Sequence, residues 1–193
     1  MILDASAGWY KNDWNGNIGW SSGAYLCPAT APTTTTGDGF ASTEVSTASF
    51  LSIGEAAVGF SYYYGGGNFA EAANPGTCTG TCPSCSHSGS YGADCSGFVA
   101  KAWLLPAALP MDSNKHPYTS TNFTAATANW SIVSRSSLQA GDALAMSGHV
   151  LMYEKDDPWG SFWAFEARGC SYGVVHNIRT AGSSFVGVRR SGI

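Results

Sequence analysis

The sequence predicts an α+β domain, because its helical and strand patterns are separated along the chain. Two apolar stretches with helical periodicity come first, at residues 43–59 and 95–105, and short strand-like segments follow from residue 143 onward. Helices followed by consecutive strands are typical of α+β folds, whereas alternating helices and strands would indicate a parallel sheet. We therefore expect N-terminal helices packed on an antiparallel sheet.

Length and composition fit one main domain with a substantial core. The chain has 193 residues, of which 44% are hydrophobic and 11% are charged, against roughly 25% charged in an average domain. The net charge of -4 predicts no nucleic-acid partner, and no apolar run has the length of a membrane span. We expect a monomer that needs neither a metal ion nor an organic cofactor.

Residues 1–42 differ in composition from the rest and are expected to form an N-terminal extension rich in Trp, Gly and Thr. Trp9, Trp14 and Trp20 alternate with Asn and Gly, and residues 32–37 have the composition of a linker or loop. We expect these tryptophans to cover the neighbouring domain rather than to bind sugar rings, because exposed aromatic side chains need a functional reason. The main domain then spans residues 43–193.

The two predicted helices begin with different residue types. Ser42 or Thr43 can supply the N-cap of the first helix. The second helix begins at Cys95, carries apolar residues at helical spacing and is stopped by Pro106. Cys95 thus lies in the first turn, where unpaired backbone N–H groups and the helix dipole stabilise a thiolate.

The second half of the domain is expected to form strands. A turn at residues 138–142 leads into them, and a second turn at 156–160 connects the first two as a hairpin. The expected strands cover residues 143–153, 162–167, 174–178 and 185–189.

Three residue types needed for thiol-dependent hydrolysis occur in this arrangement. The chemistry requires a thiolate, a base that later protonates the leaving amine, and a group that orients the base. Cys95 can supply the thiolate, His149 the base, and Glu166, on the next strand of the hairpin, the orienting carboxylate. Each also has a purely structural alternative: a buried thiol, a half-buried histidine, and an ion pair of Glu166 with Arg168 or Arg189.

Several motifs around these residues follow one another in a fixed order. They are Asp94-Cys95-Ser96-Gly97-Phe98-Val99, Leu138-Gln139-Ala140-Gly141-Asp142 and Gly148-His149-Val150, with Ser61-Tyr62-Tyr63-Tyr64-Gly65-Gly66 upstream and Phe185 to Arg190 as a closing strand. This order resembles the NlpC-type cell-wall cysteine peptidases, small papain-like enzymes that cut stem peptides of bacterial peptidoglycan. The resemblance covers residues 43–190 and implies a papain-like fold.

The resemblance also implies roles for individual residues. Cys95 would be the nucleophile, His149 the base, and Tyr62 a tyrosine whose hydroxyl faces the nucleophile. Glu166 takes the third position, which in this family is usually His, Asn or Gln. We expect substrate contacts from Tyr64, Asp94, Ser96 and Gly148. The implied reaction is hydrolysis between D-γ-glutamyl and the diamino acid of a peptidoglycan stem peptide.

Two departures from the family pattern leave alternatives open. Residues 67–93 form a long insertion before the nucleophile, and a Cys-His-Glu arrangement is more reminiscent of CHAP amidases, which would cut between muramic acid and L-alanine. A transamidase, or a toxin acting on rival cells, could use the same residues. The non-enzymatic alternative is a degenerate wall-binding module that uses Trp9 to Trp20.

The remaining cysteines favour an oxidising compartment. Cys78, Cys82 and Cys85, with His87, have a spacing that could bind zinc, but disulfides are the simpler expectation for an exported protein. The disulfide candidates are Cys27, Cys78, Cys82, Cys85 and Cys170. We expect a secreted protein whose leader has been removed, since residues 1–4 lack the basic and apolar regions of a signal peptide.

Overall fold

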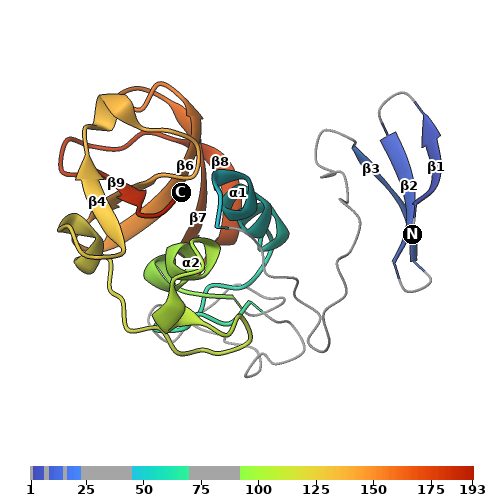
Figure 1. Ribbon diagram of the computed structural model, residues 1–193, viewed down its shortest axis with the longest axis horizontal. Helices are drawn as coiled ribbons and strands as arrows, with labels where there is room; N and C mark the ends of the chain where they lie inside the picture. Colours follow the sequence, from blue (N-terminus) through green and yellow to red (C-terminus); the bar gives the residue numbers. More distant parts are fainter. Residues whose placement is uncertain (1, 7–8, 15–16, 23–44, 70–91) are drawn as a thin grey trace. The chain divides into compact units, whose positions relative to one another are not determined.

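The chain forms two units, Met1–Ser42 and Thr43–Ile193, each with a sheet of its own (Figure 1). The computed structural model describes residues 2–6, 9–14, 17–22, 45–69 and 92–193, and for the first three of these ranges it describes the backbone alone. The predicted insertion at residues 67–93 therefore lies mostly outside the described residues.

The first unit contains a three-stranded antiparallel sheet that the sequence analysis did not predict. Its strands are β1 (Ile2–Ser6), β2 (Trp9–Trp14) and β3 (Asn17–Ser22), in the order β1-β2-β3. The sequence signal was the dipeptide Asn15-Gly16 between two aromatic segments, which is typical of a hairpin. The prediction that the tryptophan side chains cover the second unit concerns side chains outside the described residues.

The described residues of the second unit include two α-helices. The first, α1 (Thr47–Ala56), is shorter than predicted. Its N-cap is Ser46, because the Ser46 and Ser49 side chains form a reciprocal capping box. The prediction of a cap at Ser42 or Thr43 was therefore wrong. The second, α2 (Cys95–Ala102), begins at Cys95 as predicted, with Asp94 as its N-cap. The helix ends before Pro106, and Leu104, between the helix and this proline, has a positive φ of 50°.

The second unit contains a six-stranded antiparallel sheet beside its helices, so the predicted α+β class is confirmed. The strands lie in the order β4-β9-β5-β6-β7-β8. They are β4 (Trp130–Val133), β5 (Ala143–Met146), β6 (His149–Asp156), β7 (Phe162–Gly169), β8 (Gly173–Arg179) and β9 (Val186–Arg190). Three short 3₁₀ turns precede or separate strands, at Pro106–Ala108, Asn122–Thr124 and Arg135–Ser137.

The predicted strand over residues 143–153 is two strands. The chain reverses between Met146 and His149, which are paired across β5 and β6, and Gly148 has a φ of 101° that favours glycine. This reversal makes His149 the first residue of β6. The strand β4 was not predicted, because the sequence analysis assigned no element to its four residues.

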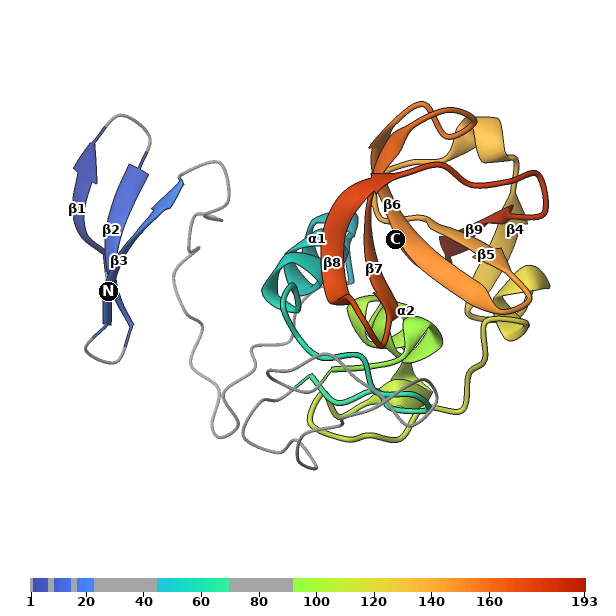
Figure 2. The ribbon, with the colours of Figure 1, turned by 180° about the vertical axis from the view of Figure 1, so that it is seen from behind.

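The sheet has apolar residues buried on both faces. On one face α2 contacts β6 and β7, and α1 contacts α2 and β7, as Figure 2 shows from behind. Residues after α1 also bond to β8: Gly59 N–H donates to Val174 O at 2.9 Å, and Val174 N–H donates to Phe60 O at 2.8 Å. The opposite face has a smaller cluster built from Leu144, Leu151, Tyr153, Phe162 and Ala164.

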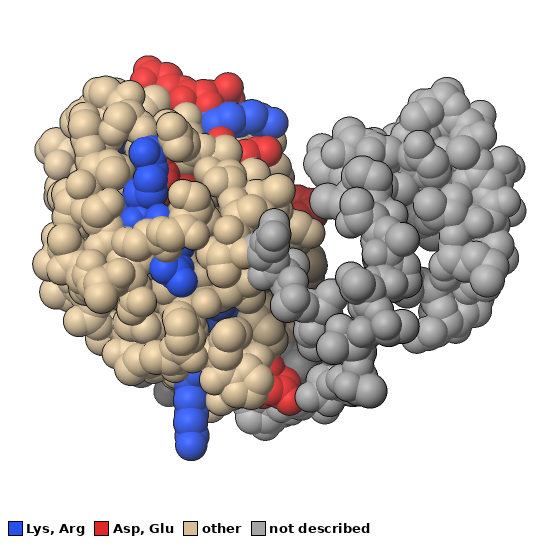
Figure 3. All heavy atoms as spheres, viewed as in Figure 1, with Lys and Arg blue, Asp and Glu red and all other residues tan. Residues whose placement is uncertain are grey.

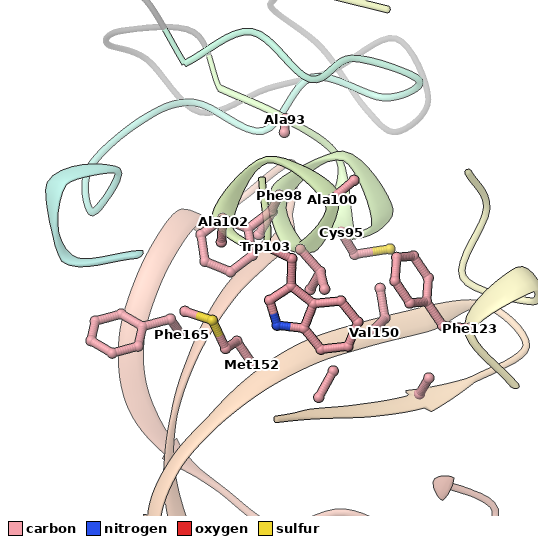
Figure 4. Close-up of a cluster of buried hydrophobic side chains, with 14 of the residues drawn as sticks. Ala93, Cys95, Phe98, Ala100, Ala102, Trp103, Phe123, Val150, Met152 and Phe165 are labelled. Atoms are coloured by element: carbon pink, nitrogen blue, oxygen red, sulfur yellow. The ribbon is translucent and has the colours of Figure 1, made fainter. Parts of the chain in front are cut away.

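Trp103 lies at the centre of the larger core, just after α2 (Figure 4). It is fully buried and its ring contacts Phe50, Phe123 and Trp130. Its indole N–H donates to Gly141 O at 2.8 Å. Trp103 therefore joins α1, α2, the 3₁₀ turn at Asn122–Thr124, β4 and the turn before β5.

Replacing Trp103 should destabilise the second unit strongly. Trp103→Ala removes one of the largest buried side chains and leaves Gly141 O without this donor, so we expect the free energy of unfolding to fall by about 3–5 kcal/mol. Urea unfolding followed by circular dichroism measures this. Ile178→Ala is the control, because Ile178 is 59% exposed and its loss should change stability by no more than about 0.5 kcal/mol.

Candidate active site

The first turn of α2 is fixed by the side chain of Asp94. Its Oδ1 accepts from the Gly97 N–H at 2.7 Å and from the Ser96 hydroxyl at 2.8 Å. Its other oxygen, Oδ2, accepts from the Gly65 N–H at 3.0 Å. One carboxylate therefore caps the helix that begins with Cys95 and also holds the Gly65 segment against it.

Gly97 allows this segment to approach the helix closely. A Cβ atom at position 97 would lie 2.2 Å from the carbonyl oxygen of Gly66, which itself accepts from the Asp94 N–H at 2.9 Å. Only glycine fits this contact. The aromatic segment that contains Tyr62 and Tyr64 is thereby held beside the N-terminus of α2.

His149 and Glu166 come together across the β6–β7 hairpin. The Nε2 atom of His149 lies 2.7 Å from Oε2 of Glu166. The Glu166 side chain has no exposed area, whereas that of His149 is 20% exposed. A histidine that reaches the surface is thus held by a carboxylate that solvent does not reach.

The pair favours charged forms of both groups. Burial alone lowers the pKa of His149, but hydrogen bonds with Cys95 and Glu166 and their charges outweigh it and raise this pKa to about 9. Burial alone raises the pKa of Glu166, but the hydrogen bond with His149 and the charge of Arg179 outweigh it, so this pKa is lowered. Both shifts favour an imidazolium beside a carboxylate.

Cys95 completes the arrangement from the helix side. It is 7% exposed and is the free thiol among the described residues. Figure 4 shows its side chain extending from α2 beside Phe123, near the Val150 strand. Because Glu166 occupies Nε2 of His149, the nitrogen left for the Cys95 thiol is Nδ1. The three groups can therefore act as nucleophile, base and orienting carboxylate.

Tyr62 is buried beside Cys95. Burial, with the charges of Cys95 and Asp94, raises the pKa of its hydroxyl well above the ordinary value, although a hydrogen bond with the Cys95 backbone opposes this. The phenol is therefore neutral at physiological pH and can take part in hydrogen bonds next to the thiol.

Of the four residues expected to contact substrate, Asp94 and Ser96 lie at the first turn of α2, Tyr64 precedes the Gly65 that bonds to Asp94, and Gly148 lies just before β6. Tyr64 is 61% exposed and free to meet a ligand. The Gly148 N–H donates to the Ser120 hydroxyl at 3.0 Å. Asp94 and Ser96 are engaged with each other in the helix cap, and Ser96 is 3% exposed. Substrate contact stays a prediction for all four.

Arg179 is a site residue that sequence reasoning missed. It lies on β8, with Nε at 3.1 Å from Oε1 of Glu166. The sequence analysis paired Glu166 with Arg168 or Arg189 instead, and Arg189 in fact binds Asp142 at 2.7 Å. The available signal was the alternation of Val175, Asn177 and Arg179 on one face of a strand that neighbours the Glu166 strand.

The disulfide candidates are only partly described. Cys170 is buried and is not a free thiol. Cys27, Cys78, Cys82 and Cys85 lie outside the described residues, so the disulfide pattern stays a prediction. Within residues 45–69 and 92–193, no group of three or more His, Cys, Asp or Glu side chains could hold a metal ion.

None of the helices in the described part of the chain is long and apolar enough to cross a membrane. Comparisons with protein-family models, with curated proteins and with solved structures found no match to this chain. The functional interpretation therefore depends on the geometry of the site and on the motifs in the sequence.

The contact with Glu166 should account for part of the raised pKa of His149. Glu166→Gln removes the negative charge beside Nε2, so we expect the pKa of His149 to fall from about 9 toward roughly 6.5. Nitrogen-15 NMR titration of the imidazole ring measures this. Glu154→Gln is the control, because Glu154 binds His176 at 2.8 Å and should leave the titration of His149 unchanged.

Proposed function

We propose that this chain is a cysteine peptidase of papain-like fold that hydrolyses amide bonds in peptidoglycan stem peptides. The observation that carries the proposal is the contact of His149 with both the Cys95 thiol and the fully buried Glu166 carboxylate. A thiol at a helix N-terminus, a histidine with a raised pKa and a buried orienting carboxylate together suit covalent acyl transfer.

The proposed acylation step moves one proton and exchanges two bonds. His149 takes the proton of Cys95, and the resulting thiolate attacks the carbonyl carbon of the scissile amide. The tetrahedral intermediate then collapses as the imidazolium gives its proton to the leaving amine nitrogen, and the C–N bond breaks. The products of this half-reaction are a thioester at Cys95 and a free amine.

Deacylation reverses the use of the same groups. His149 removes a proton from water, and the hydroxide attacks the thioester carbonyl carbon. The C–S bond breaks, and the acid product leaves as the thiolate and imidazolium re-form. Glu166 stays ionised throughout and holds the ring by its Nε2 atom, so that Nδ1 keeps facing the sulfur.

The backbone at the start of α2 is suited to stabilise the developing oxyanion. Backbone N–H groups in the first turn of a helix have no intrahelical acceptor and point toward the N-terminal end. The Gly97 N–H is already used by Asp94. The donor we propose is the N–H of Cys95, which would exchange its hydrogen bond with Tyr62 for one with the oxyanion. Tyr62 is close enough to interact with this same backbone group.

The substrate class is supported by the order of the motifs rather than by the site geometry. The motifs at Asp94 to Val99, Leu138 to Asp142 and Gly148 to Val150 resemble the NlpC-type peptidases, which act between D-γ-glutamyl and the diamino acid. The face in Figure 3 carries its charged side chains as small separate groups on a largely uncharged surface, which suits an exported enzyme. Secretion and disulfides belong to the same proposal.

A CHAP-like amidase is the second candidate, and the identity of residue 166 favours it. Glu166 provides a carboxylate as the orienting group, as in those amidases, where the NlpC-type enzymes usually have His, Asn or Gln. The same catalytic steps would then break the bond between muramic acid and L-alanine. The two candidates share Cys95 and His149 and differ in the products they release.

Incubation with defined muropeptides should separate these reactions. We expect wild-type protein to release a fragment that begins at the diamino acid, Cys95→Ala to release none, and His149→Ala to be slower by about 10²–10⁴-fold. Mass spectrometry identifies the fragments. His176→Asn is the matched control, because His176 also pairs with a glutamate but lies on the sheet face opposite to Glu166.

Each other outcome assigns the chain differently. Cleavage next to muramic acid would make it an amidase. An absence of cleavage by wild-type protein, together with wall binding that survives Cys95→Ala, would contradict the enzyme proposal and support a binding module.

A further inference from the structure

The second oxygen of the Glu166 carboxylate faces β8. While Oε2 holds His149, Oε1 lies 3.1 Å from Nε of Arg179. In the sheet register Ala164 pairs with Asn177 and Phe162 pairs with Arg179, so Asn177 and Arg179 share the sheet face of Glu166. The carboxylate therefore lies between a histidine from β6 and an arginine from β8.

The two partners of Glu166 behave differently during the proposed reaction. His149 is an imidazolium after it takes the proton of Cys95 and is neutral after it protonates the leaving amine. A buried carboxylate without a cationic partner takes up a proton rather than staying charged. Arg179 keeps its charge at every step, because a guanidinium is not deprotonated in proteins.

We propose that Arg179 is a positioning residue of this site, which keeps Glu166 ionised when His149 is neutral and so prepares the pair for the next proton transfer. This inference rests on the proposed function. The geometry supports a chain of contacts from Arg179 through Glu166 and His149 to Cys95, contributed by β8, β7, β6 and α2.

Few charged or polar groups affect the protonation of His149 and Glu166. Those that affect His149 are Cys95 and Glu166, and those that affect Glu166 are His149, Arg179 and, more weakly, the Asn177 amide. Among the residues described here, Arg179 is thus the cation of constant charge at Glu166. The Arg179 side chain as a whole is 25% exposed, although the Nε atom that faces the carboxylate is buried.

The pH dependence of Cys95 alkylation tests the inference without any substrate. Iodoacetamide reacts with the thiolate, and peptide mapping by mass spectrometry separates Cys95 from the other cysteines. We expect Arg179→Gln to shift the acid limb of the rate profile upward by about one pH unit, which is about a tenfold slower reaction on that limb. Arg179→Lys retains the charge and should restore most of the profile.

Arg168→Gln is the matched control, because Arg168 lies exposed on the same strand as Glu166 and stacks over Tyr172 at 4.1 Å. It should leave the profile unchanged. A folded Arg179→Gln variant with the wild-type profile would overturn the inference. An ordinary thiol profile in the wild-type protein would instead contradict the proposed function, so the two failures are distinguishable.

A double variant keeps the test decisive if Arg179→Gln does not fold. Glu166→Gln with Arg179→Gln removes both the buried carboxylate and its arginine partner, so it should fold as Glu166→Gln does. If Arg179 acts only through Glu166, the alkylation profiles of Glu166→Gln and the double variant should coincide. A further shift in the double variant would show that Arg179 acts by another route and would overturn the inference.

Discussion

The burial of one ionised carboxylate is the constraint on which the rest of the site depends. Glu166 has no exposed area, and an ion removed from water in this way costs on the order of several kcal/mol unless cations compensate. The compensation comes from both neighbouring strands, through His149 on β6 and Arg179 on β8. The register of three adjacent strands is therefore tied to the electrostatics of a single side chain.

Cys95 is positioned by a separate set of contacts, which meets the Glu166 contacts at His149. Asp94 caps α2 and holds Gly65, while Gly97 lets the Gly66 backbone lie against the helix. Trp103, at the other end of α2, anchors the helix to the core and to Gly141. Because α2 is fixed at both ends, it can hold Cys95 beside β6, whose His149 is held by the buried Glu166 carboxylate.

The sequence was sufficient for the parts of this arrangement that depend on local pattern. The start of α2 at Cys95 followed from apolar spacing, and the β6–β7 hairpin followed from the turn residues between two strand-like segments. The break at Gly148 was missed, because residues 143–153 are apolar enough to read as one strand. Arg179 was missed because its role depends on the neighbour of β7, and strand order is not a local property.

Two local features in the N-terminal part of the chain were also missed. The sheet of β1, β2 and β3 was missed although Asn15-Gly16 is a local hairpin signal, because the Gly- and Asn-rich composition was weighed instead. The cap of α1 was placed at Ser42 or Thr43, whereas the reciprocal bonds of Ser46 and Ser49 decide where the helix begins. Composition and single capping residues are weaker guides than a pair of side chains that satisfy each other.

A second histidine–glutamate pair in the same sheet shows what distinguishes the candidate site. His176 on β8 binds Glu154 on β6 at 2.8 Å, with side chains that are 27% and 21% exposed. Its ring stacks on Phe165 at 4.1 Å, and the nearby cation is Lys155, which is 58% exposed. Water can solvate this pair, so its charges need no fixed partner.

The His149 pair has a fully buried carboxylate, Glu166. The guanidinium of Arg179, whose charge is constant, contacts this carboxylate, and the Cys95 thiol contacts His149. The distance between the two side chains is nearly the same in both pairs, so burial and the flanking groups are what suit one of them to proton transfer.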